Sequence, residues 1–172
     1  RCGIVARNLG KLIAVPDPEQ MFLAGLLHDL GQLIIYKGEP ELSATVEWHI
    51  YNEHKERDVV EKALLGFDHS DVGALLMTNW GLPAELSEII KFHHQPESAA
   101  HFQREAKLIS LADHFVHYAE LTKKQAEIDF EQLPAVIEQY LGELNIEINT
   151  ISNVLTDMLE QSQAIEEIIF TN

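Results

Sequence analysis

The stretch FLAGLLHDLGQLII, Phe22 to Ile35, places a histidine and an aspartate side by side within an otherwise apolar segment. Apolar residues on both sides of the pair predict a central, buried helix. An unpaired carboxylate in such a place is costly, so Asp29 needs a partner. His28 alone is a poor partner, because successive residues on a helix point about 100° apart. We therefore expect further polar groups, or a bound divalent metal, to satisfy both side chains.

The rest of the chain shows helical periodicity, and the alternation typical of strands is almost absent. The sequence therefore predicts an all-α fold. We expect helices over 1–14, 18–36, 41–55, 58–66, 68–80, 83–94, 100–121, 131–142 and 148–170. Asp17 and Asp68 are predicted caps, and Gly66 is expected to close a helix. Gly31 is expected to end or bend the second helix, and Trp80 is expected in the core.

Further candidate ligands lie at helix ends or beside apolar runs, where side chains could converge on one pocket between helices. They are His69 at a helix start, His93 and His94 at a helix end, and Asp113 in ISLADHF. Together with His28 and Asp29 they offer imidazole nitrogens and carboxylate oxygens, a donor set that suits Fe, Mn or Zn. A purely hydrogen-bonded polar core without any metal is the alternative, and spacing alone leaves both open.

The last helix, part of an amphipathic C-terminal segment over 144–172, carries an apolar stripe with steps of four and three residues. The stripe comprises Leu144, Ile148, Ile151, Leu155, Met158, Ser162, Ile165 and Ile169. Such a heptad pattern is typical of a helix that packs onto its own domain. A helix that binds a partner or a second copy of the chain is the alternative interpretation.

Composition limits the classes of function. The 172 residues suit one domain, with 46% hydrophobic and 23% charged residues. Apolar runs such as MFLAGLL are too short to span a bilayer, so we expect no membrane partner. The net charge is −16, and no Lys or Arg follows Lys124, which disfavours nucleic-acid binding. The single Cys2 fits a reducing cytoplasm.

Four motifs occur in a fixed order: AGLLHDLGQLII, GFDHSDVGALLMTNWGLP, IIKFHHQP and LISLADHF. Over roughly residues 1–125 they resemble the HDOD domain, a bacterial signalling branch of the HD superfamily of metal-dependent phosphohydrolases. The resemblance implies an HD-domain-like helical bundle spanning residues 1–172. Family members usually carry another helical lobe before this region. Since the chain begins at Arg1 without methionine, we expect it to be a segment of a longer protein.

The resemblance also implies roles for the candidate ligands. In catalytic HD proteins, an early histidine, the His-Asp doublet and a later aspartate hold the metal; here the doublet is His28–Asp29 and the aspartate is Asp113. The early histidine would fall near Arg1, where the sequence reads RCGIVAR. In the related HD-GYP phosphodiesterases further histidines build a second metal position, and His69, His93 and His94 sit where those would lie.

Two departures from the HD-GYP pattern weaken a catalytic interpretation. A lysine that would stabilise charge on a phosphate is replaced by the neutral Gln32. The GYP element is also absent, because HHQPESAAHF follows the double histidine.

Three functions remain as hypotheses. The first is a signalling module with a degenerate pocket, which contacts other signalling proteins or domains. The second is a metal-dependent phosphohydrolase acting on a nucleotide or a cyclic dinucleotide. The third is a purely structural polar core.

Overall fold

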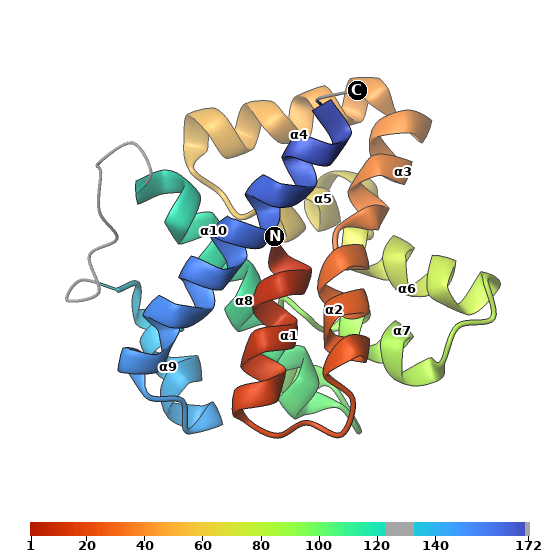
Figure 1. Cartoon of the computed structure of the whole chain (residues 1–172). Coiled ribbons are helices and arrows are strands. Elements are labelled where there is room, and N and C mark those ends of the chain that lie inside the picture. Colours follow the sequence, from red (N-terminus) through yellow and green to blue (C-terminus); the bar gives the residue numbers. More distant parts are fainter. Residues whose placement is uncertain (123–132, 171–172) are drawn as a thin grey trace. The chain divides into compact units, whose positions relative to one another are not determined.

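The computed structural model describes residues 1–122 and 133–170, and all regular structure in these two ranges is helical (Figure 1). The helices are α1 (Cys2–Leu12), α2 (Pro18–Leu27), α3 (Leu30–Gly38), α4 (Pro40–Glu53), α5 (Arg57–Leu65), α6 (His69–Asn79), α7 (Ala84–Lys91), the 3-10 helix η1 (Pro96–Ser98), α8 (Gln103–Thr122), α9 (Ala135–Leu144) and α10 (Ile148–Phe170). The predicted all-α fold is confirmed. Among these helices, none is both long and apolar enough to cross a membrane.

The chain forms two compact units. Unit 1 comprises residues 1–26 and 107–172, and unit 2 comprises residues 27–106. In unit 1, α10 packs against α1, and the Arg7 guanidinium donates to Gln161 Oε1 at 2.6 Å. In unit 2, α6 and α7 form a helical hairpin, α3 packs against α6, and α4 packs against α5.

The apolar stripe of α10 is used within unit 1 over its first half. Ile151, Leu155 and Met158 are buried, whereas Ile165 is 47% exposed. Packing onto its own unit therefore accounts for the stripe from Ile151 to Met158, whereas Ile148 before it is 39% exposed. The side chain of Ile169 lies outside the described part of the structure, and self-association through this helix stays a prediction.

Local signals set the helix ends as expected. Asp17 Oδ1 accepts hydrogen bonds from the backbone N–H groups of Glu19 and Gln20 at 3.1 and 3.2 Å. Asp68 and Asp71 form a reciprocal capping box at the start of α6. Gly66 ends α5 with a φ of 84°, a left-handed conformation that glycine adopts without steric cost.

The expected continuous helix over 18–36 is wrong, because the chain breaks at the histidine–aspartate pair. α2 ends at Leu27 and α3 begins at Leu30, with Asp29 as the N-cap residue. On a continuous helix the side chains of His28 and Asp29 would point apart, whereas in this turn they contact each other. The break also lies before Gly31, which sits inside α3 and does not end it.

Trp80 was expected in the core, and this prediction is also wrong, since the residue is 57% exposed. It lies at the C-terminal cap of α6, just before the left-handed Gly81. Met77, one turn earlier, is completely buried and occupies the inward position.

Gly31 is required by close packing between α3 and the start of α6. A Cβ atom at this position would collide with the carbonyl oxygen of His69 and would lie 3.0 Å from the backbone nitrogen of Gly73. Backbone atoms cannot move aside as a flexible side chain can. The glycine therefore sets how closely the turn with His28 and Asp29 approaches His69.

Gly31→Ala is expected to lower the free energy of unfolding by about 1–3 kcal/mol, because α3 must move away from α6. Gly38→Ala, at the other end of the same helix, meets no atom within 4 Å. This control should stay within about 1 kcal/mol of the wild type. Urea unfolding followed by circular dichroism measures both variants. Equal stability of the two would show that the α3–α6 contact is looser than described.

Candidate metal centre

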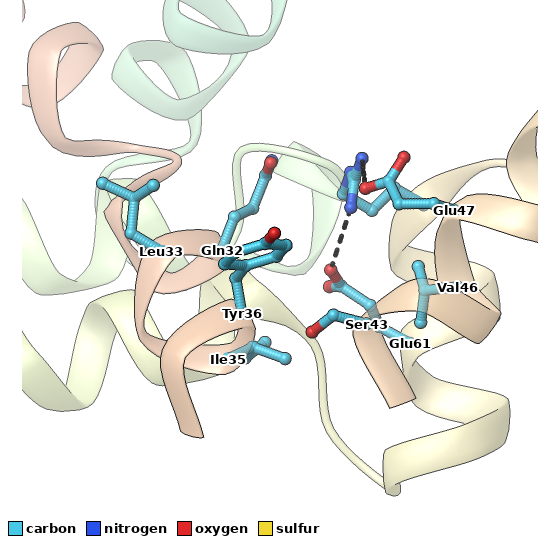
Figure 2. Close-up of a pocket in the computed structure, with 9 residues that line it drawn as sticks. Gln32, Leu33, Ile35, Tyr36, Ser43, Val46, Glu47 and Glu61 are labelled. Carbon is cyan, nitrogen blue, oxygen red and sulfur yellow. Dashed lines mark hydrogen bonds and ion pairs between the residues drawn. The ribbon is translucent and has the colours of Figure 1, made fainter. Parts of the chain in front are cut away.

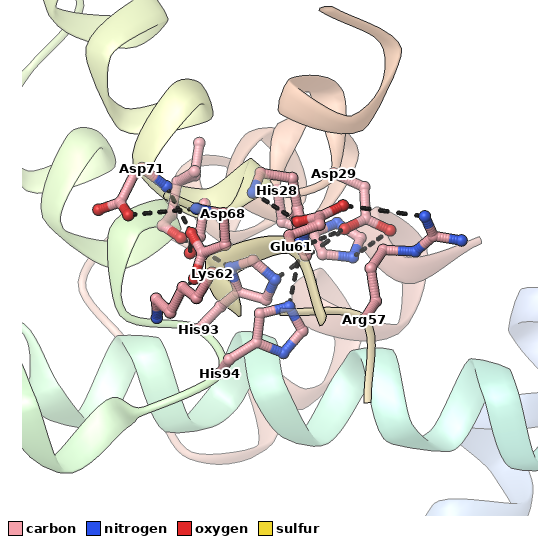
Figure 3. A network of polar contacts seen from close by, with 12 residues as sticks. His28, Asp29, Arg57, Glu61, Lys62, Asp68, Asp71, His93 and His94 are labelled. Carbon is pink, nitrogen blue, oxygen red and sulfur yellow. Dashed lines mark hydrogen bonds and ion pairs between the residues drawn. The ribbon is translucent and has the colours of Figure 1, made fainter. Parts of the chain in front are cut away.

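Five of the six predicted ligands lie in unit 2, and their side chains converge (Figure 3). They come from the α2–α3 turn (His28, Asp29), the first residue of α6 (His69) and the turn after α7 (His93, His94). Ligand atoms of His69, His93 and His94 lie within 4.8 Å of one another, and so do those of His28, Asp29 and His93. His93 belongs to both groups, which together we term the histidine cluster. Asp113 lies on α8 in unit 1, and its role as a ligand stays a prediction.

Asp29 is the carboxylate at the centre of the histidine cluster. Its Oδ1 lies 3.3 Å from His69 Nε2 and 4.0 Å from His93 Nε2, and its Oδ2 lies 3.3 Å from His28 Nε2. Burial alone would raise the pKa of Asp29. The hydrogen bond to His69 and the charges of the neighbouring imidazoles outweigh burial and hold that pKa well below its usual range. Asp29 is therefore an anion at neutral pH.

His69 is completely buried and is oriented by a carboxylate on α5. Its Nδ1 donates to Glu61 Oε2 at 2.6 Å, and its backbone N–H donates to the same oxygen at 2.8 Å. Burial lowers the pKa of His69, but hydrogen bonds to Asp29 and Glu61 outweigh it and raise the pKa to about 9. His69 Nε2 faces Asp29 and lies 2.8 Å from His94 Nε2. A carboxylate on the far ring nitrogen is the usual partner of a metal-binding histidine.

His93 supplies the strongest sign that the histidine cluster fits a metal. Its Nδ1 donates to the carbonyl oxygen of Ile90 at 2.6 Å, which leaves Nε2 as the acceptor. That Nε2 is buried, in a side chain that is only 1% exposed, and no group in residues 1–122 or 133–170 forms a hydrogen bond with it. Burial lowers the pKa of His93 well below its ordinary value, so the ring is neutral. A buried, unprotonated nitrogen beside an aspartate and other imidazoles is a ready ligand for a divalent cation.

An ion pair between the buried Asp68 and the partly exposed Lys62 lies at the start of α6, where His69 sits. Asp68 is completely buried, and its Oδ2 lies 2.6 Å from Lys62 Nζ. Burial raises the pKa of Asp68, but bonds to Lys62, Ser70 and the Asp71 N–H outweigh it and lower that pKa to about 2. Because Asp68 caps α6 as an anion, the first residue of the helix is held in one place.

Glu61 is the functional residue that the sequence did not reveal. It is 2% exposed and receives both hydrogen bonds from His69. Its segment, DVVEKALLG, carries charges at several positions, and nothing local separates this glutamate from a solvent-facing one. One signal could have indicated that Glu61 is buried. It lies four residues before Leu65, on the same face of α5, but this spacing alone is weak evidence.

An all-helical fold with a His-Asp doublet, surrounded by histidines from other helices, defines a domain of the HD type. The sequence matches the HDOD domain over residues 1–96, and the chain belongs to this family. An uncharacterized protein of Treponema pallidum (strain Nichols) is 21% identical over 144 residues, which make up 83% of this chain and 27% of that protein.

Solved structures share the fold. A protein from Shewanella amazonensis SB2B, named as a candidate phosphohydrolase, is 26% identical with a TM-score of 0.75, covering 91% of this chain and 56% of that one. An HDOD domain protein of unknown function from Geobacter sulfurreducens is 22% identical with a TM-score of 0.70. The match covers 96% of this chain and 59% of that chain. A candidate signal transduction protein from Marinobacter aquaeolei VT8 is 23% identical with a TM-score of 0.60, covering 91% and 38%. The chain thus spans less than two thirds of each relative.

Glu61→Gln is expected to move the pKa of His69 from about 9 towards its ordinary 6.5 in metal-free protein, since a negative partner is lost. Glu53→Gln, which removes a carboxylate on α4 that pairs with His49 and Lys55 and not with Glu61 or His69, should leave that pKa unchanged. An NMR titration of the His69 ring measures both variants. In the wild type the raised pKa stabilises the fold below about pH 6.5, and this contribution is lost as the pH rises through about 9. An unchanged pKa in Glu61→Gln would contradict the role of Glu61.

Proposed function

We propose that this chain is the signal-transduction type of HDOD domain, which acts through contacts with other proteins and holds a divalent metal in its histidine cluster. The residues that would hold the metal are His28, Asp29, His69, His93 and His94, with Fe, Mn or Zn as the suitable ions. The observation that carries the metal proposal is the buried, partnerless Nε2 of His93. When bound, the metal supplies a concentrated positive charge that links the α2–α3 turn, α6 and the turn after α7.

The residues of the chain would prepare that site without the metal. Glu61 keeps the proton of His69 on Nδ1, so that Nε2 faces the histidine cluster. The Ile90 carbonyl does the same for His93. Asp29 stays anionic and offsets part of the charge of a bound cation. These fixed orientations reduce the reorganisation that metal binding would otherwise require.

The charges around the histidine cluster favour signalling over phosphate-ester hydrolysis. The cations drawn beside the cluster in Figure 3, Arg57 and Lys62, are both bound to carboxylates. Arg57 lies 2.6 Å from Glu47, and Lys62 lies 2.6 Å from Asp68. Gln32 stands where a lysine would help to stabilise phosphate charge. A phosphate ester that approached the proposed metal would therefore find Arg57 and Lys62 already paired with carboxylates, whereas phosphoryl transfer usually uses side-chain cations beside the metal.

The surface of unit 2 supports a role in protein contacts. Large apolar or aromatic side chains on α3 and α4 are exposed: Leu33 at 67%, Tyr36 at 65%, Trp48 at 54% and Tyr51 at 82%. Exposed apolar side chains that gather on neighbouring helices are a common feature of interaction surfaces. We expect other signalling proteins or domains as partners.

A metal-dependent phosphohydrolase is the second candidate, with a nucleotide or a cyclic dinucleotide as substrate. Two observations favour it. The number of metal-capable side chains in the histidine cluster exceeds what a structural core needs, and the Shewanella relative is named as a candidate phosphohydrolase.

Stoichiometric binding of Mn, Fe or Zn is expected in the full chain, measured by calorimetry and elemental analysis. His93→Ala should weaken binding by more than the roughly 10- to 100-fold that loss of an outer partner costs. His101→Ala, which removes an exposed histidine of the same unit, is the matched control and should bind normally. Affinity should rise with pH towards 9, because the metal displaces a proton from His69. Binding of none of the three metals would refute the metal site.

Hydrolysis of p-nitrophenyl phosphate and of its bis-ester separates the two functions. For a signalling domain, metal-loaded wild type and Asp29→Ala should give the same background rate with each metal. Circular dichroism checks that the variant is folded. Turnover that the wild type shows and Asp29→Ala loses would overturn the signalling proposal in favour of the enzyme.

A further inference from the structure

A second polar pocket lies between α3, α4 and α5, all within unit 2 (Figure 2). Its volume is about 120 Å³. No histidine of the cluster lines it, and the two sites share one residue, Glu61. The volume is well below the roughly 300–1,000 Å³ of pockets for drug-sized ligands, so the pocket suits a molecule with a single ring.

Ser43 gives an independent sign of a ligand. The residue is 7% exposed, and its hydroxyl has no hydrogen-bond partner. Figure 2 shows Ser43 next to Glu61, with its hydroxyl turned towards Ile35 on α3. On the same helix, the hydroxyl of Thr45 donates to the backbone oxygen of Glu41, whereas the Ser43 hydroxyl forms no such bond to the backbone. A buried hydroxyl without a partner is unfavourable, and a ligand in the pocket would satisfy it.

Glu61 offers a second acceptor to the same space. Its Oε2 receives both hydrogen bonds from His69, while its Oε1 lies 3.8 Å from the Arg57 guanidinium, beyond hydrogen-bond length. Arg57 is instead bound to Glu47 at 2.6 Å. The two carboxylates, the Arg57 guanidinium and the neighbouring His69 imidazolium balance in charge, but Glu61 Oε1 remains an acceptor. A cation whose N–H groups donate to a carboxylate forms a stronger hydrogen bond than a neutral donor does.

We propose that this pocket binds a small planar cation with paired N–H donors, an amidinium or guanidinium group on an apolar body. The donors would bond Glu61 Oε1 and Ser43 Oγ. Tyr36 and Val46, which line the same pocket, would pack against the apolar part. Planar N–H pairs match the fork of a carboxylate better than an ammonium group does.

Because Glu61 lines this pocket and also bonds His69, a ligand in the pocket would regulate metal binding. This regulatory use rests on the metal function proposed above. Glu61 orients His69, so a ligand that bonds Glu61 alters the group that positions a metal ligand. Binding of the cation itself does not require a metal. The two proposals can therefore fail separately.

Benzamidine is the probe for the test, with benzamide as the neutral analogue and benzoate as the anionic one. Each is titrated into the full 172-residue chain without metal, and binding is followed by ¹H–¹⁵N NMR. Benzamidine is expected to bind most tightly and benzoate least, with shifts on α3, α4 and α5. Tighter or equal binding of benzoate, or no shifts at these helices with millimolar benzamidine, overturns the proposal.

Two variants locate the binding. Ser43→Ala should weaken benzamidine about 2- to 10-fold through loss of one hydrogen bond. It should not lower the stability of the fold, because the hydroxyl had no partner. Glu47→Gln should also weaken binding, since it frees Arg57 to pair with Glu61 Oε1, the acceptor that the ligand needs. Thr45→Ala, an exposed hydroxyl on the same helix, should bind as the wild type does. Unchanged affinity in Ser43→Ala and Glu47→Gln would overturn the assigned site.

Discussion

The structure of unit 2 depends on a buried imidazolium held between two carboxylates. His69 is completely buried, and only Glu61 on one side and Asp29 on the other make its charge tolerable. The three residues come from α6, α5 and the α2–α3 turn, so a single electrostatic requirement ties these elements together. The collision that a side chain at Gly31 would cause shows how little freedom the arrangement has.

The orientation of the rings distinguishes a metal centre from an ordinary polar core. His69 and His93 both use Nδ1 for a hydrogen bond away from the centre, to Glu61 and to the Ile90 carbonyl respectively. Their Nε2 atoms are thereby turned towards Asp29. A core satisfied by hydrogen bonds alone would not leave His93 Nε2 without a partner. The unsatisfied nitrogen therefore supports the metal site proposed above over a purely structural role.

The sequence predicted what depends on local chemistry and missed what depends on tertiary contacts. The caps at Asp17 and Asp68 and the left-handed Gly66 need only neighbouring backbone atoms, so their patterns were sufficient. The break at His28 and Asp29 was missed because apolar periodicity continues across it, while its cause lies in residues about 40 and 65 positions away. Glu61 was missed for the same reason, since its partner His69 is on another helix.

A metal in this position would act on signalling through stability, whether or not chemistry occurs there. Metal binding to prearranged ligands contributes directly to the free energy of the fold that holds them. The ligands lie on the α2–α3 turn, α6 and the turn after α7, while the exposed apolar residues Leu33 and Tyr36 lie on α3, directly after the doublet. Asp29 is the N-cap residue of α3, so a metal that fixed Asp29 would also fix the start of the helix that carries Leu33 and Tyr36. If the domain signals as proposed, the side chains of the histidine cluster would matter even without catalysis, because a metal held by them would order the start of a helix that carries exposed apolar residues.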